Sequence, residues 1–123
     1  MSEKKIMNDT LMALSALPET MVWRNNTGQA WAGKRANVQI GSYVQIKAGM
    51  ALIMNAQPVS FGLLGSADII GCSAGTPLAV EIKDLKGRQS EQQKLFQSAW
   101  TRCGGVYILA RDPQDALTEL KSL

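Results

Sequence analysis

The chain has 123 residues, a length typical of one domain, and we expect residues 1–123 to fold as a single domain. Histidine is absent and the two cysteines match no zinc-binding spacing, which excludes the usual Cys/His zinc sites and every mechanism with a histidine base. Lys and Arg number 13 against 10 Asp and Glu, and this net charge of +3 permits binding to phosphates without showing it.

The first element is a predicted helix at residues 3–15, where apolar side chains recur every three or four positions and Ser2 can cap the start. Pro18 follows this helix. Residues 20–24 predict a strand, and the sequence Asn-Asn-Thr-Gly at 25–28 is typical of a turn or loop.

The signals are weakest in residues 29–64, where Gly and Ala are scattered among short apolar runs. Strand-like pieces occur at 43–47 and 51–54. The intervening residues 47–50 can turn one piece back on the other, so we expect a hairpin here.

The second half of the chain has clearer signals. Two short strands are expected at 67–70 and 78–83, a capped helix at 90–103, a buried strand at 106–110 and a last helix that Asp112 and Pro113 begin. Because the helix at 90–103 crosses between two strands, the order predicts an α/β fold with a mixed central sheet flanked by helices. The expected apolar face of that helix is Leu95, Phe96, Ala99, Trp100 and Cys103. Both cysteines are expected to be small core residues.

Three charged residues are predicted to meet at one end of this sheet. Alternation along the strand at 78–83 places Glu81 and Lys83 on the same face, and a hairpin with the preceding strand brings Asp68 close to Glu81. Two adjacent carboxylates repel each other, and a hard divalent cation relieves that repulsion. Such a cation beside a lysine suits phosphodiester hydrolysis without histidine. The alternative interpretation is a solvated surface ion pair.

Four segments together resemble the virus-type replication-repair nuclease (VRR-Nuc) domain: residues 22–28, 65–71, 80–83 and 87–96. This domain belongs to the PD-(D/E)xK superfamily, so the resemblance implies a restriction-endonuclease-like core. The residue before Asp68 is Ala67, whereas the superfamily's name gives proline at this place.

The resemblance implies a role for each residue of the predicted site. Asp68 and Glu81 would bind Mg²⁺ or Mn²⁺, with the carbonyl of Ile82 as a further ligand, and Lys83 would position the attacking water. Gln93 matches a glutamine that the family places near its active site.

Two of the implied residues have alternative interpretations. Gln93 can instead complete a capping box with Ser90. The superfamily often adds a glutamate from the first helix, and Glu3 is the best match, with Glu19 as a weaker substitute. The alternative for Glu3 is that a glutamate in a first helical turn is favourable in any protein.

The expected contacts with nucleic acid involve basic and aromatic side chains. Arg24 lies where the family has a substrate-facing loop and would bind a phosphate, or would form a structural ion pair. Lys86 and Arg88 follow the predicted catalytic strand and can track a DNA backbone, or only form a solvated face. Trp31, beside the basic pair at 34–35, is a candidate for contact with DNA or with a second copy of the chain.

The resemblance therefore implies a Mg²⁺- or Mn²⁺-dependent endonuclease that acts on branched DNA such as Holliday junctions in DNA repair. The alternatives are a flap or restriction-like nuclease and a catalytically inactive DNA-binding module. Stand-alone members of the family are of phage or bacterial type and act as homodimers. The N-terminal residues do not read as a signal peptide and no apolar run is long enough to span a bilayer, so we expect a cytoplasmic protein without a membrane partner.

Overall fold

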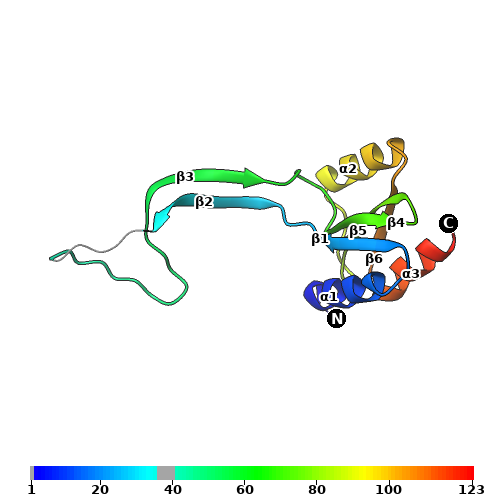
Figure 1. Cartoon of the computed structure of the whole chain (residues 1–123), viewed down its shortest axis with the longest axis horizontal. Coiled ribbons are helices and arrows are strands. Elements are labelled where there is room, and N and C mark those ends of the chain that lie inside the picture. The colour runs from blue at the N-terminus through cyan, green and yellow to red at the C-terminus, as the bar shows by residue number, and fades with distance from the viewer. Residues whose placement is uncertain (1, 36–40) are drawn as a thin grey trace. The chain divides into compact units, whose positions relative to one another are not determined.

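The computed structural model describes residues 2–35 and 41–123, and the chain divides into two compact units. One unit comprises Met1–Thr27 and Gly62–Leu123, and the other comprises Gly28–Phe61. Figure 1 shows the elements of both units, and each unit is described by itself.

The first unit contains a four-stranded sheet with the order β1-β4-β5-β6. Strands β1, β4 and β5 pair in antiparallel fashion, whereas β5 and β6 are parallel. The elements of this unit are α1 (Glu3–Ser15), β1 (Thr20–Arg24), β4 (Ile69–Ser73), β5 (Thr76–Ile82), α2 (Glu91–Arg102), β6 (Val106–Ala110) and α3 (Pro113–Lys121). This arrangement confirms the predicted α/β fold with a mixed sheet and flanking helices.

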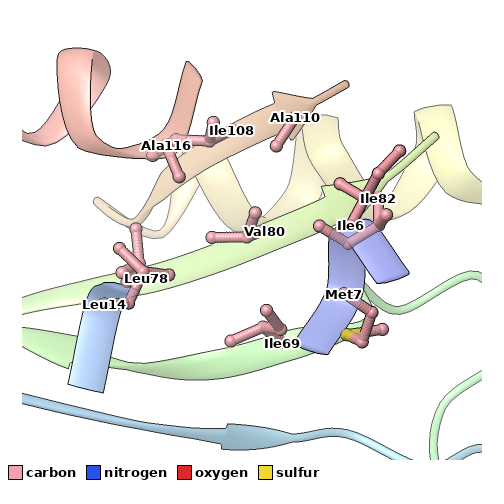
Figure 2. Close-up of a cluster of buried hydrophobic side chains, with 10 residues drawn as sticks. All are labelled: Ile6, Met7, Leu14, Ile69, Leu78, Val80, Ile82, Ile108, Ala110 and Ala116. Carbon is pink, nitrogen blue, oxygen red and sulfur yellow. The ribbon is translucent and has the colours of Figure 1, made fainter. Parts of the chain in front are cut away.

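Helices α1 and α3 pack against each other on one face of the sheet, and buried side chains of both helices and of the sheet form the core between them. Ser2 caps α1 by accepting a hydrogen bond from the backbone of Lys5, as predicted. Figure 2 shows the buried cluster, in which side chains of α1 lie against those of β4 and β5. Its members are Ile6, Met7, Leu14, Ile69, Leu78, Val80, Ile82, Ile108, Ala110 and Ala116.

Helix α2 lies across the other face of the sheet (Figure 1) and buries less than predicted. Phe96 stacks on Trp100 with ring centroids 5.5 Å apart, and the Trp100 indole donates a hydrogen bond to the carbonyl of Val106. These two aromatic side chains are one helical turn apart, so they lie on the same stripe of α2, the one that faces the sheet. The expected burial of Leu95, Ala99 and Cys103 is wrong, since all three are exposed. Cys72 on β4 is exposed as well, so neither cysteine is a core residue.

The second unit is an antiparallel hairpin of β2 (Gly28–Arg35) and β3 (Ile53–Phe61). The predicted hairpin of 43–47 with 51–54 is wrong. A turn does form where we expected it, with Met50 donating to the carbonyl of Lys47, but residues 42–47 form no strand. The longer pairing of β2 with β3 satisfies more backbone hydrogen-bonding groups than the short pairing would. Residues 36–40 of this stretch lie outside the described part of the chain.

Candidate active site

The β4–β5 hairpin brings Asp68 and Glu81 together, as predicted. A two-residue turn at Ala74 and Gly75, both with positive φ, joins the strands and sets their register. This register pairs Ile69 with Val80, so that Asp68 and Glu81 follow as the next opposed positions at the end of the ladder. The backbone N–H of Ile82 donates to Oδ2 of Asp68 at 2.8 Å, which holds the Asp68 carboxylate against β5.

Glu81 is a buried acid on the sheet face that α2 covers. Its side chain is only 2% exposed. Burial, together with the hydrogen bond and the negative charge of the Asp68 carboxylate, raises the pKa of Glu81 from 4.5 to about 9. The positive charge of Lys83 lowers this pKa and the charge of Glu3 raises it further, and both effects are smaller. Without a cation, Glu81 is therefore held in its neutral form at pH 7.

The two carboxyl oxygens of Glu81 have different surroundings. Nε2 of Gln93 donates to Oε1 at 3.3 Å. The carbonyl oxygen of the same amide accepts a hydrogen bond from the backbone of Ser90, which completes the capping box of α2. The two interpretations of Gln93 are thus compatible in one side chain. Oε2 of Glu81 is buried and accepts no hydrogen bond from an N–H or hydroxyl group of the described residues.

Lys83 follows β5 and is half-buried, and its backbone N–H donates to the carbonyl of Ala110. A Cβ added at Gly87 would lie 3.1 Å from Cδ of Lys83, 3.2 Å from Oδ1 of Asp84 and 3.3 Å from Oε1 of Glu3. These three side chains therefore surround the α-carbon of Gly87. The absence of a side chain at Gly87 leaves them room beside the end of β5.

An open pocket of about 450 Å³ lies at the same end of the sheet. Its lining residues are Glu3, Lys4, Met7, Arg24, Asp68 and Ile82. Oε1 of Glu3 accepts a long hydrogen bond, 3.4 Å, from the backbone of Asp84. The structure thus places Glu3 in the same pocket as Asp68. Glu19 lies at the opposite end of β1 and is exposed, so the structure does not bring this weaker substitute to the site.

Arg24 ends β1 and its side chain is exposed at the pocket. Within residues 2–35 and 41–123 it has no carboxylate partner, so the alternative of a structural ion pair is not observed. Lys86 and Arg88 are exposed in the segment between β5 and α2. Trp31 is on strand β2 in the other unit.

Three residues that sequence reasoning missed hold the backbone around the site. The amide of Asn25 donates to Oγ of Ser66 at 2.7 Å and to the carbonyl of Ala67 at 2.9 Å, and its backbone N–H donates to the carbonyl of Asp68. Asn25 therefore fixes the residues that lead into β4. The only sequence signal for this role was the turn-like composition of residues 25–28.

The other two missed residues, Asp84 and Arg111, shape the segment after β5. Oδ1 of Asp84 accepts from the backbone of Lys86 at 3.0 Å and of Gly87 at 2.6 Å, which makes a local turn. The Arg111 guanidinium donates to the carbonyls of Asp84 and Gly87, the latter at 2.8 Å. The short spacing of Asp84 and Gly87 could have indicated the turn, but no local pattern indicates the arginine.

The donor set at this site fits a hard divalent cation. Asp68 and Glu81 would supply carboxylate oxygens, one of which is buried and accepts no N–H or O–H hydrogen bond within residues 2–35 and 41–123. Mg²⁺ commonly uses one or two carboxylates with waters and substrate phosphate. No group of three His, Cys, Asp or Glu side chains able to hold a metal was found in residues 2–35 and 41–123. Two carboxyl groups, those of Asp68 and Glu81, thus lie together at this end of the sheet, and Glu3 is bonded to the backbone of Asp84 beside them.

No protein-family model matches the sequence, and no curated protein matches it. Of the helices in the described part of the chain, none combines the length and the apolar character that crossing a membrane requires.

Proposed function

We propose that this chain is a Mg²⁺- or Mn²⁺-dependent endonuclease of the VRR-Nuc type with a PD-(D/E)xK core, and that it cleaves branched DNA. The observation that carries the proposal is the pair of adjacent carboxyl groups at Asp68 and Glu81. Oε2 of Glu81 is buried and accepts no hydrogen bond from an N–H or hydroxyl group in the described part of the chain, and the pKa of Glu81 is raised to about 9. Such an acid is unfavourable in isolation, whereas a bound cation would both use the free oxygen and favour the ionised form.

Each nearby side chain has a part in this proposal. When bound, the cation supplies Lewis-acid chemistry for phosphodiester hydrolysis by water. Asp68 and Glu81 hold it, with the Ile82 carbonyl as a further ligand, and Gln93 keeps the Glu81 carboxyl oriented through its hydrogen bond. Lys83 orients the attacking water and offsets negative charge on the phosphate.

Arg24, which is exposed in the pocket, is suited to bind a substrate phosphate through its guanidinium group. Lys86 and Arg88 extend the positive charge along the segment after β5. Branched DNA as the substrate, and a homodimer as the active form, rest on the resemblance of the sequence to VRR-Nuc domains. A two-fold symmetric dimer would present two active sites to a symmetric four-way junction. Sedimentation of the purified protein tests the dimer.

The test of the activity is cleavage of a labelled four-way junction, a flap and a linear duplex, each with Mg²⁺, with Mn²⁺ and with EDTA. We expect cleavage of the junction with either metal and none in EDTA. Lys83→Ala and Glu81→Ala should each lower the rate by about 100-fold or more. The matched controls Lys121→Ala and Glu119→Ala, at exposed positions of α3, should cleave as the wild type does.

A second readout measures the metal directly. Calorimetric titration of Mn²⁺ should show binding to the wild type and to Glu119→Ala, and no binding to Glu81→Ala. Cleavage of only the flap or the duplex would keep the nuclease and remove the junction specificity. If folded protein binds DNA but cleaves none of the three with either metal, the chain is a DNA-binding module instead.

A further inference from the structure

The positive excess of the chain lies entirely in the hairpin unit. Residues 28–61 contain three basic side chains, Lys34, Arg35 and Lys47, and no acidic side chain. The rest of the chain has 10 basic and 10 acidic residues and is formally neutral. A segment that carries the whole net charge of a protein is suited to a polyanionic partner.

The hairpin also exposes apolar and aromatic side chains. Every residue of β2 is exposed, and Trp31 is 68% exposed. The sheet of this unit has two strands, and in β3 every residue except Ile53 is exposed. An isolated two-stranded hairpin is marginally stable in water, and binding to a partner would cover this surface.

The strand register places basic side chains on both faces of this ribbon. Opposed residues of an antiparallel pair share a face, and successive residues of a strand point to opposite faces. Lys34, opposite Met54, therefore lies on one face, and Arg35, opposite Ile53, lies on the other. Trp31 shares the face of Arg35, where it lines a shallow pocket of about 450 Å³ with Ile53 and Ala56.

A β-bulge maintains this arrangement near the basic pair. The register shifts between Ala32 and Lys34, and Asn55 on the opposite strand has a φ of +53°. A Cβ at Gly33 would lie 2.6 Å from the carbonyl oxygen of Met54, so only glycine fits there. Bulges increase the twist of a ribbon, and a twisted ribbon follows a DNA groove better than a flat one.

We propose that the β2–β3 hairpin is a DNA-binding element that inserts into the major groove of a duplex arm of the substrate. This groove admits a two-stranded β-ribbon and has phosphates along both walls. A ribbon with a cation on each face, Lys34 and Arg35, contacts both walls at once. Trp31 adds aromatic surface for contact with bases. The proposal rests on the proposed function in one respect, because the identity of the nucleic acid as DNA comes from it.

The charge of the hairpin favours DNA over a second copy of this chain. Two hairpins with three cations and no anion each would repel one another when paired. A DNA groove offers the complementary charge instead. A self-association surface is therefore an outcome of the test rather than the expectation.

The test measures DNA binding in EDTA, so that it does not depend on cleavage. Fluorescence anisotropy gives the Kd for a labelled duplex and a labelled four-way junction over a range of KCl concentrations. The variant Lys34→Ala/Arg35→Ala should bind at least about tenfold more weakly, and the slope of log Kd against log salt should fall by roughly two. The matched control Arg102→Ala/Lys121→Ala removes the same charges from the ends of α2 and α3 and should leave the slope unchanged.

Substitutions of Trp31 distinguish an aromatic contact with DNA from general electrostatic attraction. Trp31→Ala should weaken binding about tenfold without a change in the salt slope, and Trp31→Phe should restore most of the loss. Circular dichroism and thermal melting should be the same for all variants, because the substituted side chains are exposed. Lys34→Gln/Arg35→Gln repeats the charge test with residues that keep the length of the side chains.

The proposal is overturned if the hairpin variant and its control lower affinity and slope equally, because that result would reflect net charge alone. It is also overturned if the variant dissociates a dimer in sedimentation and leaves the salt slope unchanged. A protein that cleaves no DNA, but whose hairpin variants show the expected loss of binding, would refute the nuclease and support the hairpin. Normal cleavage by the wild type, together with an unchanged salt slope in the hairpin variants, would support the nuclease and refute the hairpin as a DNA-binding element.

Discussion

Glu81 combines two properties that an ordinary surface carboxylate lacks. It is almost fully buried, and the neighbouring charge that affects its pKa most is that of a second carboxyl group, Asp68. Both effects favour the neutral acid over the carboxylate. The folded state and the unfolded chain therefore differ in how strongly they hold this proton, and this difference makes stability depend on pH.

We predict that the metal-free protein loses stability as the pH rises from about 4.5 to about 9. In this window the unfolded chain has released the Glu81 proton and the folded protein still holds it, so folding requires proton uptake. The free energy of unfolding should fall by up to about 1.4 kcal/mol per pH unit. Urea denaturation in EDTA at pH 5, 6.5 and 8 would measure this for the wild type and for Glu81→Gln, a neutral residue of the same shape.

As the pH rises, the free energy of unfolding of Glu81→Gln should increase relative to that of the wild type. Mg²⁺ should reduce the pH dependence of the wild type, because a cation stabilises the ionised carboxylate. Parallel curves for the wild type and Glu81→Gln would show that the environment of Glu81 does not hold its proton.

Gln93 makes two contacts, and two substitutions separate them. Gln93→Ala removes both the capping box and the hydrogen bond to Glu81, and should lower the free energy of unfolding by about 1 kcal/mol. Gln93→Glu keeps the acceptor of the capping box but has no donor for Glu81. We predict that Gln93→Glu recovers the stability, measured at pH 5 by thermal melting, but not the cleavage rate. Equal recovery of both would mean that Gln93 serves the helix end only.

The segment between β5 and α2 depends on a residue from after β6. Arg111 donates to the carbonyls of Asp84 and Gly87, and Gly87 lies against the side chains of Lys83 and Glu3. An arginine that bonds two carbonyls of one turn holds the turn closed. Arg111 is thus a positioning residue for the side chains around the end of β5.

We predict that Arg111→Ala destabilises the protein by about 1–3 kcal/mol, because two partly buried carbonyls lose their donor. Arg111→Lys keeps the charge but lacks the two fixed donors, so it should recover only part of the loss. Thermal melting and the cleavage rate would both be measured, with Arg102→Ala as the control at an exposed site. Full activity in Arg111→Ala would show that this turn needs no such support.

The β4–β5–α2 region could be predicted because its signals are local. The expected hairpin of two neighbouring strands brought Asp68 close to Glu81, and the spacing of Ser90 and Gln93 indicated the capped start of α2. Local signals did not predict which apolar residues of α2 face the sheet. The stacked pair Phe96 and Trp100 takes that position, and this depends on how the helix packs.

The hairpin unit lacked such signals. Strand β3 contains Pro58 and strand β2 contains Gly33, and sequence rules disfavour both residue types inside a strand. The strands are also separated by residues 36–52, a connection much longer than a typical hairpin turn. The contacts of Asn25 and Arg111 were missed for a related reason, since each joins residues far apart in the sequence and leaves no local pattern.

At the scale of the whole molecule, the two units differ in what they contain: the buried core and the candidate active site lie in one, and the net positive charge lies in the other. Every member of the buried core cluster belongs to the unit of Met1–Thr27 and Gly62–Leu123, and so do all the residues of the candidate active site. The unit of Gly28–Phe61 carries the net positive charge and has exposed strands. Stability and metal binding should therefore be separable from much of the affinity for DNA.

The sharpest test of this division removes residues 28–61 and joins Thr27 to Gly62 through an Asn-Gly turn. The two ends can be joined, because a Cβ at Gly62 would lie 3.0 Å from the Cα of Thr27. The shortened chain keeps the complete core cluster, so we predict cooperative thermal unfolding and Mn²⁺ binding like those of the full chain. Its native residues have no net charge, so its affinity for DNA should fall by more than tenfold with a smaller salt dependence. A shortened chain that binds DNA as the full chain does would place the DNA contacts around Arg24, Lys86 and Arg88 instead, whereas one that fails to fold would show that the sheet unit depends on the hairpin.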